Sequence, residues 1–242
     1  LTSHSRRTAS PPLNSSVRHP MPRLFTYCIP VDDGAAPNPY WGVCTLAICK
    51  PVIRRTAKIG DWVVGTGSTS APSGDLSGKI VYAMEVSSVM SLAEYDEWTR
   101  NHRREKIPDL QSQDLHRRVG DSIYDFSCNP ANQRPSVHNE GNRETDLGGK
   151  NVLLSMNFYY FGNRPLPLPP HLQRIIHQTQ GHKVNANAAL VAPFLKWFKS
   201  QNFERNCLRG TPDRLGEVAA LLLEHAKIRC GCSIDAEKAP LC

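Results

Sequence analysis

Residues able to do chemistry are concentrated between Asp32 and Ser68. At the start of this segment, Asp33 and Asn38 lie in a loop that a glycine and two prolines keep out of regular structure. A carboxylate and an amide together distinguish donors from acceptors, as reading the edge of a nucleobase requires. The alternative is a rigid loop whose polar side chains only close turns, and the residue types favour neither interpretation.

A basic cluster follows this loop. Lys50 and Arg54 fall on one face of a short helix that begins at Pro51, and Arg55 is adjacent. Such a face either is simply solvated or contacts phosphate, where arginine binds bidentately and lysine acts as a point charge. We favour phosphate contact for Arg54 and Arg55.

Three further side chains have reactive chemistry. Cys49 directly precedes Lys50, and a neighbouring cation can activate a thiol as a nucleophile. Its place at the end of an apolar run instead favours a buried, inert cysteine. His138 and Asp146 have the types of an acid–base pair, but they lie in the polar stretch 125–150, which favours scattered surface side chains. No complete catalytic constellation is visible, so the sequence leaves catalysis undecided.

Aromatic residues offer stacking surfaces for a base. Trp41 is one candidate, and either Tyr159 or Tyr160 is another, because neighbours in a strand face opposite sides and at most one of them should be core. Ser68 ends a glycine-flanked loop whose amides can approach an anion, although the lysine and helix of a P-loop are missing. The predicted base- or nucleotide-binding residues are Asp33, Asn38, Trp41, Lys50, Arg54, Arg55, Ser68, His138, Asp146, Tyr159 and Tyr160.

The order of expected elements indicates an α+β fold, with strands first and helices later. Strands are predicted at 23–31, 62–64, 80–86 and 151–161, and short apolar segment 43–49 precedes the Pro51 helix. Ser91 and Glu94 form a capping box that opens a helix to about residue 106, and its arginines, including Arg100, Arg103 and Arg104, are read as a solvated face. Later helices are expected at 170–181, at 188–201 and after Thr211.

Bulk composition excludes some classes of protein. The chain has 242 residues and a net charge of +7, a mild preference for polyanionic partners. No apolar run is long enough to span a bilayer.

The eight cysteines lack regular spacing, which favours reduced, buried thiols over a disulfide framework. A metal site at Cys230 and Cys232 with Cys207 or His225 is disfavoured, because no second pair of closely spaced cysteines exists. Residues 1–20 carry three arginines and no acid, and their Ser- and Pro-rich composition predicts a disordered extension.

From Met21 to Pro212 the chain resembles the nucleotide modification associated domain 2 family. The densest match runs from Asp33 to Ser68 and comprises the segments DGAAPNP, TLAICKP and GDWVVGTGS. Further matching segments are RPSVH at 134–138, DLGGKNVL at 146–153 and FYYFG at 158–162. The resemblance implies one globular unit over 21–212, followed by a C-terminal helix and tail at 213–242.

The short helix, Gly-Asp turn and apolar strand also resemble PUA, ASCH and EVE domains, which implies a small, partly open mixed β-barrel flanked by helices. Together these likenesses imply a protein that binds a modified nucleobase or nucleotide in DNA or RNA, within a DNA base-modification or defence system. Two alternatives stay open: an enzyme that makes or removes a nucleotide modification, using Asp33, Cys49, His138 and Asp146, and a scaffold subunit with its contact surface on helices 188–229. Protein partners, no cofactor, no metal, no membrane and a cytoplasmic location are expected.

Overall fold

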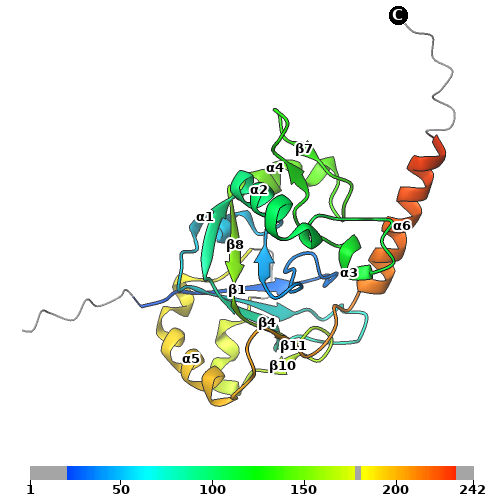
Figure 1. The fold of residues 1–242 in the computed structure, drawn as a ribbon. Helices are drawn as coiled ribbons and strands as arrows, with labels where there is room; N and C mark the ends of the chain where they lie inside the picture. Colours follow the sequence, from blue (N-terminus) through cyan, green and yellow to red (C-terminus); the bar gives the residue numbers. More distant parts are fainter. Residues whose placement is uncertain (1–20, 178–180, 233–242) are drawn as a thin grey trace, which may run out of the picture.

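A twisted mixed sheet forms the middle of the molecule (Figure 1). The computed structural model describes residues 21–177 and 181–232, with side chains described through residue 227. In this sheet the strand order is β1-β3-β4-β9-β11, and β10 pairs with β4. The strands are β1 (Leu24–Ile29), β3 (Trp62–Gly67), β4 (Lys79–Glu85), β9 (Asn157–Tyr160), β10 (Leu166–Pro167) and β11 (Cys207–Leu208). β1 and β3 run parallel, because the chain crosses over between them through α1 (Pro51–Thr56).

Both faces of this sheet are buried. In β1, Phe25 and Tyr27 point to one face, while Leu24 and Thr26 point to the other, as the two-residue period of a strand requires. The Leu24 face packs against α5 (Val191–Ser200) and two 3₁₀ helices, Pro170–Ile175 and Asn185–Leu190. The Phe25 face packs against α1 and a second sheet.

The second sheet has the order β2-β8-β5, with β2 at Cys44–Leu46, β5 at Ser88–Ser91 and β8 at Asn151–Ser155. Its outer side is covered by α2 (Leu92–His102), through Leu92 and Tyr95. The remaining elements are α3 (Leu115–Arg118), the hairpin β6 (Tyr124–Asp125) and β7 (Asn132–Gln133), α4 (Arg143–Gly148), 3₁₀ helices at Arg104–Lys106 and Glu140–Asn142, and α6 (Leu215–Cys232). In Figure 1, α6 stands at the edge of the molecule beside α3.

The structure confirms the α+β class. The capping box is present: Ser91 accepts from the Glu94 amide at 3.2 Å, and Glu94 accepts from the Ser91 amide at 2.7 Å. In the described residues no sheet closes into a barrel, so the expected PUA-like barrel is not observed. The reason is that β2, β5 and β8 pair with one another and stack against the main sheet instead of joining its edge.

Several expected elements differ in detail. The strand predicted at 151–161 is two strands, because the chain passes from the second sheet to the first around Met156. The polar stretch 125–150 holds β7 and α4. Within the described part of the helix expected at 170–181, Pro170–Ile175 is a 3₁₀ helix that ends before Ile176. The disordered extension predicted at 1–20 lies outside the described residues, and the proposed unit boundaries stay a prediction.

No helix in the described ranges combines the length and the apolarity that crossing a membrane requires. The five cysteines whose side chains are described, Cys28, Cys44, Cys49, Cys128 and Cys207, are all free thiols. Cys128 is exposed, contrary to the expectation of burial, because it lies in the loop between β6 and β7.

Asp32 links the first strand to the middle of the sheet. The Tyr160 hydroxyl donates its single proton between the two oxygens of this carboxylate, at 2.8 and 2.7 Å, and the Asp32 side chain is buried. Burial raises the pKa of Asp32 from 3.8 to about 7, although the hydrogen bond from Tyr160 works in the opposite direction. The folded state therefore binds this proton more tightly than the unfolded state.

We predict a pH-dependent stability that Asp32→Asn removes. Because the folded-state pKa is raised, the contribution of Asp32 is fully present below about pH 4 and is lost as the pH rises to about 7. Over that interval the free energy of unfolding of the wild type should fall relative to Asp32→Asn by about 1.4 kcal/mol per pH unit. Urea unfolding at several pH values measures this difference, and parallel profiles for the two proteins would contradict it.

Candidate active site

Cys49 lies in a tight turn between β2 and α1. Its φ is 56°, and that of Lys50 is 40°, so two consecutive residues with side chains adopt the left-handed conformation. Such strain persists only where the surroundings enforce it, and it is concentrated at functional sites. A strained strand–turn–helix junction is also the device that presents the nucleophile in α/β-hydrolases. The turn therefore displays the Cys49 thiol at a fixed position.

The side chain of Arg54 fixes this turn by hydrogen bonds made in the interior. Its side chain is fully buried, and all its described hydrogen bonds go to backbone carbonyls. Nε donates to Cys49 at 2.7 Å, and Nη1 donates to Ala47 at 2.6 Å and to Asn151 at 3.0 Å. Nη2 donates to the carbonyl of Asp146. One guanidinium thus joins the Cys49 turn to β8 and α4.

The thiol faces an imidazole and a carboxylate in series. Cys49 Sγ is 3.4 Å from His138 Nε2, and His138 Nδ1 is 2.6 Å from Asp146 Oδ2. Because an ionised carboxylate only accepts, Nδ1 carries the proton of that bond and Nε2 is directed at the thiol. Nucleophile, base and orienting acid in this order are the arrangement of a catalytic triad.

Asp146 contacts both His138 and Cys49. It is completely buried in α4, and its Oδ1 accepts the backbone N–H of Cys49 at 2.8 Å. The hydroxyl of Tyr124 donates to Oδ2 at 3.1 Å, alongside the bond from His138. The carboxylate therefore sets the orientation of the imidazole and the position of the nucleophile's backbone together.

Electrostatics favour a charged imidazole. Burial by itself lowers the pKa of His138, but its hydrogen bonds to Asp146 and Cys49 outweigh that effect and raise the pKa to about 10. A protonated imidazole beside a sulfur atom stabilises the thiolate, which is the nucleophilic form. The raised pKa of His138 therefore places a positively charged imidazole next to the Cys49 sulfur at neutral pH.

A small cavity of about 190 Å³ opens in front of the thiol. Its polar lining consists of Asp33, Cys49, Lys50 and His138, and its other walls are largely apolar. The Lys50 ammonium lies 4.6 Å from the centre of the Tyr27 ring, which also lines the cavity. This volume is below the range of about 300–1,000 Å³ of sites for drug-sized ligands, so only a small part of a substrate fits.

Binding of a metal ion is the alternative role for the three residues of the triad. Cys49, His138 and Asp146 have ligand atoms within 4.8 Å of one another. Asp146 is already committed to protein donors, however, because three of its roughly four acceptor positions take bonds from His138, from the Cys49 amide and from Tyr124. Only Cys49 and His138 have a ligand atom outside these bonds, whereas catalytic zinc sites use about three protein ligands. The donor set fits a triad better than a metal centre.

The predicted binding residues are distributed over several places. Asp33, Lys50 and His138 meet at the cavity, and Asp146 lies behind it. Arg55 is exposed and donates to the Gly148 carbonyl at 2.6 Å. Ser68 lines a separate hollow of about 590 Å³. The structure does not bring all of the predicted residues into one pocket.

Some of these residues serve the interior. Asn38 is buried and donates to the carbonyls of Gly34 and Val119, while its Oδ1 accepts from the buried Lys106 at 2.7 Å. Trp41 packs edge-on against Tyr40. The expectation that only one of the two tyrosines is core was wrong, because both faces of the sheet are covered. Tyr159 stacks on Trp62, and Tyr160 bonds Asp32.

The sequence analysis missed Tyr124 and the structural role of Arg54. Nothing in the sequence marks Tyr124. For Arg54 a signal was present in the glycine pair Gly148-Gly149, because a Cβ at Gly149 would collide with the Arg54 guanidinium. A glycine at such a position indicates that another group approaches the backbone closely.

The chain matches the family model of nucleotide modification associated domain 2 over residues 21–217. The chain belongs to this family. No curated protein and no solved structure matches it. The family match begins at Met21, as the resemblance predicted, and extends just into α6. It includes Cys49, His138 and Asp146, so the whole triad lies within the nucleotide modification domain.

Replacing Arg54 should destabilise the protein far more than replacing its neighbour. In Arg54→Met four carbonyls, two buried and two partly buried, lose their donor, and each buried unsatisfied group costs about 1–3 kcal/mol, so we expect a total loss of about 3 kcal/mol or more. Arg55→Met, the matched control, should cost less than about 1 kcal/mol because Arg55 is exposed. Arg54→Lys keeps the positive charge but not the planar, multi-donor guanidinium. Its loss in free energy of unfolding should lie between those of Arg54→Met and Arg55→Met. Urea unfolding compares the three variants, and equal losses for Arg54→Met and Arg55→Met would refute the role of Arg54.

Proposed function

We propose that this protein is a cysteine-dependent enzyme of a nucleotide modification system. The observation that carries the proposal is the chain of contacts from Cys49 through His138 to Asp146. The family supplies the general setting, nucleotide modification. On this proposal Cys49 is the nucleophile, His138 the acid–base group and Asp146 the residue that orients it.

The triad supports substitution at an electrophilic carbon through a covalent intermediate. The thiolate of Cys49 forms an S–C bond to that carbon, and the leaving group departs with the proton from His138. Water or a second nucleophile then attacks the same carbon, His138 takes its proton, and the S–C bond breaks. Every atom and electron pair is accounted for without an oxidant or a reductant.

The cavity suggests which part of the substrate enters. Its volume of about 190 Å³ suits a single small group, such as a nucleobase or the modification that it carries. Asp33 can accept hydrogen bonds from an amino or imino group, and Lys50 can stabilise negative charge that develops during attack. The base-contact role that we predicted for Asp33, and the place of Lys50 among the predicted base- or nucleotide-binding residues, stay part of the proposal.

Recognition of a modified base without catalysis, our first expectation, becomes the second candidate. The polar cavity that includes Asp33 and Lys50 is compatible with it. A strained turn, an aligned imidazole and a buried carboxylate are not needed for binding alone, and this favours the enzyme. A nucleophilic thiol also requires a reducing environment, which supports a cytoplasmic location.

Selective alkylation tests the nucleophile. At pH 7 iodoacetamide should modify Cys49 faster than Cys128, although Cys128 is the more exposed thiol. His138→Gln should slow modification of Cys49 by about tenfold or more and leave that of Cys128 unchanged. Peptide mass spectrometry measures both rates in the same sample, so Cys128 is an internal control. If Cys49 reacts no faster than Cys128, the proposed activation is excluded.

Nucleoside analysis then tests the reaction itself. Nucleic acid from cells that produce the wild type should differ in its modified nucleosides from that of cells producing Cys49→Ser. Because serine keeps the size of the side chain but is a poor nucleophile, the folded binding site is preserved in this control. Identical nucleoside profiles for the two proteins, with Cys49 proven reactive, would leave recognition as the better account.

A further inference from the structure

Two hollows lie next to each other along α6. One, of about 440 Å³, is lined by His138 and by His225 of α6. The other, of about 600 Å³, is lined by Arg100, Arg104 and Arg117. They share three lining residues, Leu110, Arg134 and Pro135, so one continues into the other.

The arginines that line the second hollow outnumber the carboxylates that pair with them. Asp96 is shared between Arg100 at 3.3 Å and Arg134 at 2.7 Å. Arg117 is 3.9 Å from Asp109, at the limit of an ion pair. In the described part of the chain Arg104 has no carboxylate partner, and its Nε donates only to a backbone carbonyl.

Two arginines that line this hollow also have a donor without a partner. Nε of Arg100 and Nε of Arg117 are buried, and neither has a hydrogen-bond partner among the described residues. A buried guanidinium N–H without a partner is unfavourable unless a ligand supplies an acceptor. Phosphate oxygens match this need in charge and in geometry, because arginine binds them bidentately.

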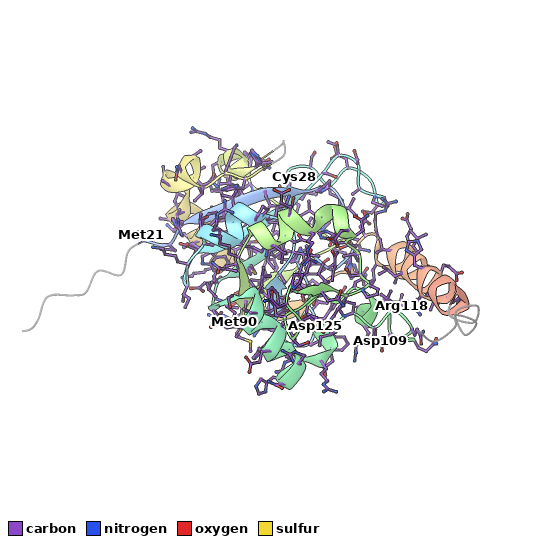
Figure 2. The ribbon with its side chains drawn as sticks, turned by 90° about the horizontal axis from the view of Figure 1, so that it is seen from above. Met21, Cys28, Met90, Asp109, Arg118 and Asp125 are labelled. Atoms are coloured by element: carbon purple, nitrogen blue, oxygen red, sulfur yellow. The ribbon has the colours of Figure 1, made fainter. Side chains whose placement is uncertain are left out.

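The hollows lead to the candidate active site. His138 lines both the first hollow and the cavity in front of Cys49. Their wall is fixed where α3 meets α6: Arg118 donates to the Ala219 carbonyl at 3.1 Å and to the Ser112 carbonyl at 2.7 Å. In Figure 2, Asp109 and Arg118 lie beside α6. The basic hollow therefore adjoins the first hollow, and the first hollow meets the cavity of Cys49 at His138.

We infer that the two hollows bind a single strand of nucleic acid, with its phosphates against Arg100, Arg104 and Arg117 and one nucleotide directed to Cys49. This inference rests on the proposed function and names its substrate class. A single strand fits better than a duplex, because the cavity at Cys49 admits only one small group and a base must be unpaired to enter it. It fits better than a free nucleotide, because the arginines and the thiol line different hollows.

Oligonucleotide binding tests this inference. The probe is a fluorescent single strand of about twelve nucleotides, in deoxyribose and ribose forms, titrated across roughly 50–200 mM salt. Arg104→Gln/Arg117→Gln should weaken binding by about tenfold or more and reduce the salt slope by about 1.4, since each phosphate contact contributes about 0.7. The matched control, Arg174→Gln/Arg205→Gln, removes the same charge from exposed sites elsewhere and should bind as the wild type does.

The outcomes separate this inference from the proposed enzyme. Cys49→Ala should bind the strand as the wild type does, because binding precedes chemistry. The strand should also protect Cys49 from iodoacetamide in the wild type but not in Arg104→Gln/Arg117→Gln. Equal affinity of the two double variants for the strand would overturn the inference about strand binding. If Cys49 still reacts with iodoacetamide in that case, the proposed enzyme function is unaffected. Protection by a mononucleotide equal to that by the strand overturns the polymer as the substrate class.

Discussion

The candidate active site depends on one buried arginine. Arg54 donates to carbonyls in the Cys49 turn and in α4 and β8, which follow that turn by about one hundred residues in the chain. Its burial lowers the pKa of the guanidinium to about 10, which still leaves it charged at neutral pH. A charge so enclosed is tolerated only because carbonyl oxygens surround it, and this requirement fixes the three segments against one another.

This constraint explains the unusual backbone at Cys49. Left-handed conformations at Cys49 and Lys50 cost energy, and the Cys49 carbonyl and amide are each held by a partner, Arg54 and Asp146 respectively. The strain is thus maintained by contacts from α1 and α4 and not by the turn itself. A thiol held in this way is preorganised, as the proposed nucleophilic role requires.

The layered fold gives the site its chemical environment. The main sheet is covered on both faces, so the strand residues that reach the cavity, such as Tyr27, are backed by core. The polar residues Asp33, Cys49 and His138 come from loops outside the sheets. Functional side chains on loops held by a rigid scaffold are a common arrangement, and here the His138 loop lines both the cavity and the neighbouring hollow beside α6.

The sequence by itself determined the α+β class, the family, the capped helix at Ser91 and most of the strands, because periodicity, caps and motifs are local signals. It also offered Cys49 as a candidate nucleophile and His138 with Asp146 as a candidate acid–base pair, although it favoured an inert buried cysteine and scattered surface side chains. Only the tertiary structure decided that they form one chain of contacts, since His138 and Asp146 reach Cys49 from about ninety residues away. It also decided that Arg54 lies in the interior and not on a phosphate-binding surface. Whether a charged side chain faces solvent or a ring of carbonyls depends on packing between distant segments, and no local pattern records that packing.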